Sequence, residues 1–284
     1  MQVITQVKEL RETMQALRCA GKSIGFVPTM GALHEGHLQL LRASVKDNDI
    51  TVCSIFVNPT QFNNADDYKL YPRTLDADIE LLETTGCDFI FSPSPEDIYP
   101  QQTMLQFSFG KLEQVMEGEH RPGHFNGVAT IVGKLFNMVQ PHKAYFGQKD
   151  LQQVAVVRQL ILGVGFNIEL VCYPTVRETD GLAMSSRNTR LNTDQRETAV
   201  SLHQALEQAR KQLGQQSIES IKASVTDYLQ HKPEVELEYF EIADPLTLQP
   251  LSTLTGVQEV ALCIAAHVGP VRLIDNLVVN LSEV

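Results

Sequence analysis

Two histidines lie three residues apart in the stretch Pro28–His37, which reads PTMGALHEGH. If a helix begins here, that spacing places both imidazoles on one face of its first turn. There they join unpaired backbone N–H groups and the positive end of the helix dipole, which together favour phosphate. Gly31 and Gly36 would let a nucleotide approach the backbone closely. The stretch therefore predicts a phosphate site. The alternatives are that His34 caps the helix while His37 packs in the core, or a zinc site, for which no second His/Cys cluster supplies a third ligand.

A second block, Gly181–Asn188, reads GLAMSSRN and combines two hydroxyl groups with a guanidinium. Ser185, Ser186 and Arg187 suit an oxyanion because their donors can point at several oxygens together. Taken alone, the block fits equally a solvated loop ahead of the helix expected near residue 193.

Two amide side chains, Gln61 and Gln153, are candidates for binding a hydroxylated ligand. An amide both donates to and accepts from hydroxyls without adding charge. The alternative is that both are ordinary surface glutamines.

Four charged or titratable residues fit more than one role in the sequence. Asp76 and Asp78 are candidates for magnesium ligands, but residues two apart on a helix face different directions. We therefore interpret both as solvated and leave the metal ligands unknown. Arg121 and His124 lie in a Pro/Gly loop and fit phosphate contacts or a dimer-facing turn equally well.

The composition limits the classes of partner. The chain has 284 residues, 43% of them hydrophobic, and a formal net charge of -11, which opposes attraction to nucleic acid or anionic lipid. No apolar run is long enough to span a bilayer and the N-terminus does not resemble a signal peptide, so we expect a cytoplasmic protein. The five cysteines are odd in number and scattered, which predicts neither a disulfide framework nor a zinc site but mostly small buried side chains.

The elements that must position these residues alternate along the first part of the chain. Helical and strand patterns alternate in the order helix 7–20, strand 23–29, helix from 38, strand 50–57, helix 75–84, strand 87–91, helix 125–139, strand 143–146, helix 151–163 and strand 168–171. Such alternation with continuous apolar strands predicts an α/β fold, a Rossmann-like parallel sheet with helices on both faces. Ligands of such sheets bind beyond the carboxyl ends of the strands, which the loops starting at Pro28, Asn58 and Gly147 leave.

After residue 175 the pattern changes to two long polar helices, 193–213 and 217–230, followed by strands at 235–242 and 260–266. Helices followed by strands indicate a smaller C-terminal α+β domain. We place the boundary near Pro174, which gives an N-terminal domain of residues 1–174 and a C-terminal domain of residues 175–284.

The His-x-Gly-His stretch resembles the signature of the nucleotidyltransferase superfamily, whose two histidines bind ATP phosphates. Along essentially the whole chain the sequence is similar to the pantothenate synthetase family, the pantoate:beta-alanine ligases. The segments that carry this resemblance are VPTMG from Val27, FVNPTQF from Phe56, YPRT from Tyr71, RPGHF from Arg121, FGQKD from Phe146 and MSSR from Met184.

The resemblance implies a binding role for each matching residue. The ATP-binding residues it implies are Met30, Gly31, Ala32, Leu33, His34, Glu35, Gly36, His37, Gly147, Gln148, Lys149, Asp150, Val176, Met184, Ser185, Ser186 and Arg187. It makes Gln61 and Gln153 the pantoate glutamines, with Gln61 also contacting beta-alanine, and gives His37 the proton-donor role. Gln148 departs from the family, which commonly has glutamate there, so the contribution of this position is open.

The implied reaction has two steps. Pantoate attacks the α-phosphate of ATP to give pantoyl adenylate and pyrophosphate, and beta-alanine then displaces AMP to give pantothenate. Magnesium and the catalytic residues, which are His34, His37, Lys149, Ser186 and Arg187, would offset the negative charge on the phosphates. The resemblance also implies a homodimer formed through the N-terminal domain. The alternatives are another adenylyl-transferring enzyme on the same scaffold and a non-catalytic nucleotide-binding protein.

Overall fold

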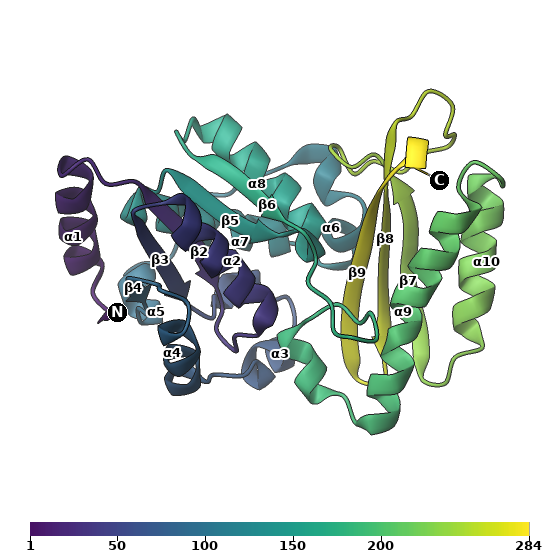
Figure 1. Cartoon of the computed structure of the whole chain (residues 1–284), viewed down its shortest axis with the longest axis horizontal. Helices are drawn as coiled ribbons and strands as arrows, with labels where there is room; N and C mark the ends of the chain where they lie inside the picture. Colours follow the sequence, from purple (N-terminus) through teal and green to yellow (C-terminus); the bar gives the residue numbers. More distant parts are fainter. Residues whose placement is uncertain (284) are drawn as a thin grey trace.

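The computed structural model describes residues 1–283 and contains two separate β-sheets (Figure 1). The larger is a six-stranded, fully parallel sheet with the strand order β1-β4-β3-β2-β5-β6. Its strands are β1 (Gln2–Ile4), β2 (Ile24–Thr29), β3 (Ile50–Ile55), β4 (Phe89–Phe91), β5 (Lys143–Gly147) and β6 (Glu169–Tyr173). The predicted parallel sheet is confirmed.

Helices cover both faces of this sheet. The helices of this part of the chain are α1 (Val7–Cys19), α2 (Glu35–Asp47), α3 (Ala65–Leu70), α4 (Leu75–Glu83), α5 (Pro95–Ile98), α6 (Met116–His120), α7 (His124–Val139) and α8 (Leu151–Val164). One apolar cluster joins α1, α7 and α8 to the sheet, and a second joins α2 and α4 to its other face. In β2, Phe26 belongs to the first cluster and Val27 to the second, and both are fully buried. A strand buried on both faces has the continuous apolar sequence that predicted this arrangement.

The smaller sheet is antiparallel and has the order β7-β8-β9. It comprises β7 (Val235–Ala243), β8 (Glu259–Val268) and β9 (Val271–Asn280), and is covered by the helices α9 (Thr193–Gln212) and α10 (Ile218–Gln230). These elements follow the larger sheet in the chain and lie together at the right of Figure 1. The α+β arrangement of the C-terminal part is therefore as expected.

A further apolar cluster joins the C-terminal sheet to helices of the N-terminal part. Leu112, Met116 and Val156 from the first part pack with Ala261 and Cys263 of β8. The C-terminal sheet is thus covered by α9 and α10 on one side and by the N-terminal part on the other. Each sheet has its own core, in keeping with two domains, while the boundary at Pro174 stays a prediction.

The expected elements are present to within a few residues, and those the sequence did not predict are mostly short. The exception is the ten-residue strand β9. Its sequence VRLIDNLVVN holds Asp275 and Asn276 at its centre, residue types that strands disfavour. Three of the five cysteines, Cys53, Cys87 and Cys263, are buried as expected, whereas Cys19 and Cys172 are exposed. No helix within residues 1–283 combines the length and apolarity needed to cross a membrane.

Candidate active site

A cavity of about 200 Å³ lies at the carboxyl ends of the neighbouring strands β3, β2 and β5. Of the residues predicted from the sequence, it is lined by Met30, His34, Gly36, His37, Gln61, Gly147, Lys149, Asp150, Gln153, Val176, Met184, Ser185, Ser186 and Arg187. Five predicted nucleotide residues do not line it, namely Gly31, Ala32, Leu33, Glu35 and Gln148. The loops after three adjacent strands thus meet the 184–187 loop in one space.

The two histidine rings lie against each other, tilted by 39°, at the start of α2. His34 is the N-cap residue, with an extended backbone, and its ring centroid lies 4.1 Å from that of His37. The backbone N–H of His34 donates to Nδ1 of His37 at 3.3 Å, so the neutral His37 ring carries its proton on Nε2. Nδ1 of His34 is buried and has no hydrogen-bond partner within residues 1–283. Both residues line the cavity, and the Nε2–H group of His37 remains available to a ligand there.

Both histidines are held neutral. Burial, followed by the charge of Lys149, lowers the pKa of His34 to about 4. Burial, followed by His34 and Lys149, lowers the pKa of His37 well below its ordinary value. At neutral pH the imidazoles are hydrogen-bonding groups, and the fixed positive charge lining the cavity comes from Lys149 and Arg187.

Gly36 lines the cavity, and it also leaves room for the imidazole of His34. A Cβ atom at position 36 would lie 2.9 Å from Cε1 of His34. A side chain here would therefore push the imidazole away from the start of the helix. This contact gives the glycine of the His-x-Gly-His stretch a role that the spacing alone did not indicate.

Asp78 holds the histidine loop, which corrects the prediction that it is solvated. Its side chain is 1% exposed and accepts hydrogen bonds from the backbone N–H of Ala32 at 3.0 Å and of Leu33 at 2.7 Å. Thr74 Oγ1 donates to the same carboxylate at 3.2 Å. Ala32 has a φ of 49°, an unfavourable value for a residue with a Cβ, so these bonds keep the loop in a strained conformation. Asp76, by contrast, is exposed as expected.

Gln61 and Gln153 both line the cavity, so neither is a simple surface residue. Gln61 is buried, and its Oε1 accepts a hydrogen bond from Asn58 Nδ2 at 3.1 Å. Its backbone carbonyl lies 2.8 Å from Nδ1 of His124. Asn58 and His124 fix the position of Gln61, a function that the sequence analysis did not assign to either.

His124 is buried within the protein, which does not fit a dimer-facing turn, and the phosphate contact stays a prediction. Its side chain is buried at the start of α7, and burial followed by the charge of Arg121 lowers its pKa to about 3. Arg121 instead forms an ion pair with Glu117 at 3.3 Å. The neutral His124 ring therefore donates from Nδ1 to the Gln61 carbonyl.

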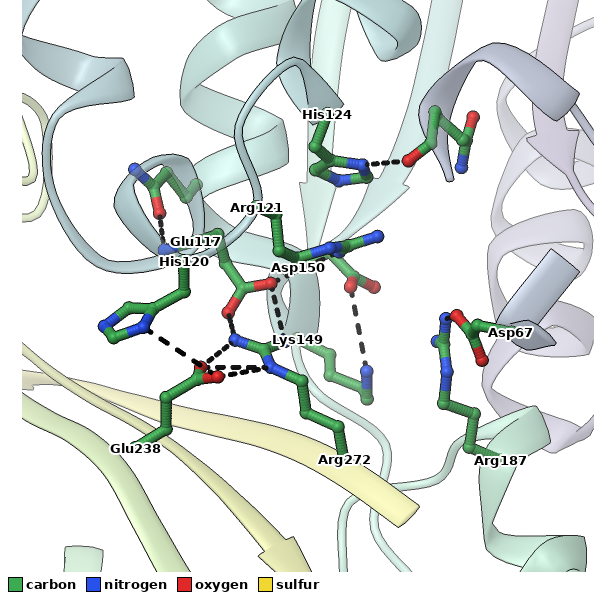
Figure 2. Close-up of polar contacts among 12 residues, drawn as sticks. Asp67, Glu117, His120, Arg121, His124, Lys149, Asp150, Arg187, Glu238 and Arg272 are labelled. Carbon is green, nitrogen blue, oxygen red and sulfur yellow. Dashed lines mark hydrogen bonds and ion pairs between the residues drawn. The ribbon is translucent and has the colours of Figure 1, made fainter. Parts of the chain in front are cut away.

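The 184–187 loop reaches the histidine loop directly. Ser186 Oγ donates to the backbone carbonyl of Ala32 at 2.9 Å. Arg187 and Arg190 both bind Asp67 on α3, at 2.8 and 3.0 Å (Figure 2 draws the Arg187 pair). Burial alone would raise the pKa of Asp67, but the hydrogen bonds from these arginines hold it below its ordinary value. Asp67 was missed because nothing near it in the sequence marks it as a partner of this loop.

A partly buried ion network joins helix α6 to the C-terminal sheet beside the cavity. Figure 2 shows Arg272 of β9 between Glu117 of α6 and Glu238 of β7. The guanidinium binds both carboxylate oxygens of Glu117, at 2.6 and 2.9 Å, and Tyr239 donates to the same group at 3.0 Å. Burial would raise the pKa of Glu117, but Arg272 and Arg121 bring it down to about 2. The C-terminal sheet is therefore attached to the N-terminal part by charge as well as by apolar packing.

The fold and this cavity together define the class of protein. A parallel sheet with a His-x-Gly-His turn and a Met-Ser-Ser-Arg loop facing one cavity is the arrangement of an α/β enzyme that binds its ligand beyond the carboxyl ends of the strands. The chain belongs to the pantoate-beta-alanine ligase family, whose family model matches residues 2–278.

Individual relatives match over nearly their whole length. The chain is 48% identical over 277 residues to the pantothenate synthetase of Bacteroides fragilis and 49% identical to that of Bacteroides thetaiotaomicron, covering 98% of each. The pantothenate synthetase structure of Thermus thermophilus superposes with a TM-score of 0.91 at 43% identity, covering 98% of this chain and 99% of that one.

A pantoate-beta-alanine ligase of Francisella tularensis, solved in complex with beta-gamma ATP and beta-alanine, matches with a TM-score of 0.82 at 35% identity, covering 98% of this chain and 97% of that one. The chain is therefore a ligase, and its activity is the ATP-dependent joining of pantoate to beta-alanine. The predicted family and enzyme class are confirmed.

Proposed function

We propose that the ligase works through a pantoyl adenylate formed in the 200 Å³ cavity. The observation that carries this proposal is the convergence of two chemically different groups of residues on one space. The amides of Gln61 and Gln153 suit the hydroxyls of pantoate, while Lys149 and Arg187 suit phosphate. Reactants held together in this way react as if in one molecule.

In the first step, a carboxylate oxygen of pantoate attacks the α-phosphorus of ATP. The bond from that phosphorus to the bridging oxygen breaks, and pyrophosphate leaves with the electron pair. Negative charge grows on the leaving group, where His37 Nε2–H and Lys149 supply donors and Ser186 with Arg187 approaches from the opposite loop. The ring of His34 lines the same cavity and belongs to the same set of polar groups.

In the second step, the neutral amine of beta-alanine attacks the carbonyl carbon of the adenylate. The bond from that carbon to the phosphate oxygen breaks, AMP leaves, and the nitrogen loses a proton as the amide forms. Gln61 supports this step as well, because its buried amide is fixed by Asn58 and His124 within reach of the same cavity.

Magnesium fits this site as a companion of the triphosphate. Among residues 1–283 no cluster of three or more His, Cys, Asp or Glu could hold a metal, and the Asp78 carboxylate is already bonded to backbone N–H groups. Asp150 is the one carboxylate among the described residues that line the cavity, and magnesium commonly uses one carboxylate together with substrate phosphates. When bound, the ion would neutralise charge on the phosphate oxygens.

We propose that the C-terminal part closes the cavity. The 184–187 loop follows the predicted boundary, and its Ser186 and Arg187 contact Ala32 and Asp67 of the first domain. Closure of this kind excludes water, which would hydrolyse the mixed anhydride. Arg187→Ala should slow adenylate formation and increase leakage to free pantoate and AMP. Unchanged leakage would mean that the loop is no lid.

The proposed assembly is a homodimer formed through the N-terminal domain, and the cytoplasm is the proposed compartment. Support for the dimer comes from an open groove of about 1060 Å³ between α1, α7 and α8, which includes Leu105 and Val164. Their side chains are 64% and 54% exposed, and the neighbouring Met104 is 93% exposed. Leu105→Asp should yield a monomer in sedimentation experiments, whereas an unchanged mass would place the contact elsewhere.

Isotope exchange between pyrophosphate and ATP tests the adenylate pathway. Exchange that requires pantoate and proceeds without beta-alanine supports the proposal. Exchange with an unrelated acid but not with pantoate would support another adenylyl-transferring enzyme. Absence of both exchange and ligation would indicate a nucleotide-binding protein without this activity.

A further inference from the structure

Two consecutive residues at the centre of β9, Asp275 and Asn276, contact both loops that face the phosphate side of the cavity. Their side chains are 4% and 3% exposed. Buried polar side chains of this kind are stable only when their hydrogen bonds are made within the protein. The hydrogen-bond partners of Asp275 and Asn276 therefore show which segments these two residues hold in place.

Asn276 binds the loop that carries Lys149. Its Nδ2 donates to the backbone carbonyl of Gln148 at 2.9 Å and to that of Lys149 at 2.8 Å. Its Oδ1 accepts from Gln148 Nε2 at 3.3 Å. One amide thus uses both donor hydrogens and its acceptor on the two residues that follow Gly147.

Asp275 binds the other loop through Arg177. The carboxylate accepts two hydrogen bonds from the Arg177 guanidinium, at 2.6 and 2.9 Å, and Arg177 also donates to the carbonyls of Gly181 and Asn276. Arg177 belongs to a small hairpin in which it bridges to Ala183. The ends of this hairpin, Val176 and Met184, are joined by a backbone hydrogen bond of 3.0 Å and line the cavity.

We propose that Asp275 and Asn276 position the two loops against each other, with Asn276 setting the place of Lys149. This rests on the roles proposed above for Lys149 and the 184–187 loop. Neither residue touches the reacting atoms, so both act through the loops. Because catalytic groups must be held to within a fraction of an ångström, loss of this support should reduce the rate.

The inference also gives Gln148 a function. Its side chain does not line the cavity but donates to Asn276, which a glutamate at this position could not do. Gln148 is therefore part of the support for Lys149.

Asn276→Ala tests the proposal, with Asn280→Ala as the matched control. Asn280 is the same residue type on the same strand, and its side chain caps only the turn at Ser282. We expect Asn276→Ala to lower kcat/KM for ATP at least tenfold and to change KM for pantoate less than threefold, while Asn280→Ala leaves both within twofold. Asn276→Asp cannot donate to the two carbonyls, so its kcat/KM for ATP should fall at least as far as that of Asn276→Ala.

A double variant separates positioning from a general loss of stability. If Asn276 acts through Lys149, Asn276→Ala should cost less than threefold in a chain that already carries Lys149→Ala. If the losses caused by the two substitutions multiply in the double variant, the inference is overturned. It is also overturned if Asn276→Ala alone keeps kcat/KM for ATP within twofold of the wild type. Near-normal turnover of Lys149→Ala itself would overturn the role proposed for that lysine and, with it, the positioning role of Asn276.

Discussion

Asp67 Oδ2 accepts a hydrogen bond from Arg187 Nη2 at 2.8 Å, although the two residues are 120 positions apart in the chain. The same carboxylate accepts from Arg190 at 3.0 Å. Figure 2 shows the Asp67 carboxylate lying against the Arg187 guanidinium. A phosphate bound by Arg187 would have to compete with this carboxylate.

We therefore expect Asp67→Asn to tighten the binding of ATP. The asparagine keeps the size of the side chain but removes its charge. Arg187 then loses a weaker interaction with position 67 when it binds a phosphate. The expected fall in Kd for ATP is about two- to fivefold, the range of a partly exposed ion pair. Titration of the nucleotide by calorimetry measures it, with Asp66→Asn as the matched control. Weaker binding by Asp67→Asn would show that Asp67 assists the nucleotide instead of competing with it.

His37→Ala should slow pyrophosphate exchange by about tenfold to a thousandfold without unfolding the protein, as for other losses of a preorganised donor. The reason is the Nε2–H group of His37, which the hydrogen bond from His34 N to Nδ1 leaves free for a phosphate oxygen. His231→Ala, at an exposed site after α10, is the control. Near-normal exchange in the His37 variant would remove this histidine from the mechanism.

Gln61→Ala and Gln153→Ala should each raise KM for pantoate about fivefold and leave KM for ATP nearly unchanged. Both amides line the cavity, and each lost hydrogen bond to a neutral hydroxyl is worth about 1 kcal/mol. Steady-state kinetics with each substrate varied in turn gives both constants, and the exposed Gln216→Ala serves as the control. Equal rises for the two substrates would mean that these glutamines do not select pantoate.

The stability of the protein should fall as the pH is lowered from about 6.5 to 4.5. Folding lowers the pKa of His34 to about 4 and that of His124 to about 3, and also lowers that of His37. In this window the unfolded chain binds protons that the folded chain does not, so protonation favours unfolding. The pKa of Glu117 falls on folding from its ordinary value of 4.5 to about 2, so Glu117 lowers the stability further only below about pH 4.5.

Urea unfolding followed at pH 7.5, 6.0 and 5.0 measures this dependence. The unfolding midpoint should fall steadily between pH 6.5 and 5.0, and His124→Gln should reduce the slope because one buried histidine is gone. A midpoint that is constant over this range would contradict the lowered pKa values.

The sequence by itself determined the larger sheet and the loops of the site. A strand such as Ile24–Thr29, buried on both faces, has a continuous apolar sequence that can be recognised without its neighbours. Short sequence motifs contain the two histidines, Lys149 and the Ser185–Arg187 segment. Such motifs can be recognised because their residues are neighbours in the sequence. Their convergence follows from the rule that parallel strands present their carboxyl ends on one edge of the sheet.

Only the tertiary structure decided which residues hold those motifs in place. Asp78 accepts hydrogen bonds from a loop 45 and 46 positions away, Arg272 binds Glu117 across 155 positions, and Asn276 reaches the Lys149 carbonyl across 127. Such partners leave no periodic or local signal, because an acid or an amide in the sequence looks the same whether it faces water or a buried N–H group. The distinction arises when folding removes water from these groups and leaves a distant part of the chain as the only partner that can replace it.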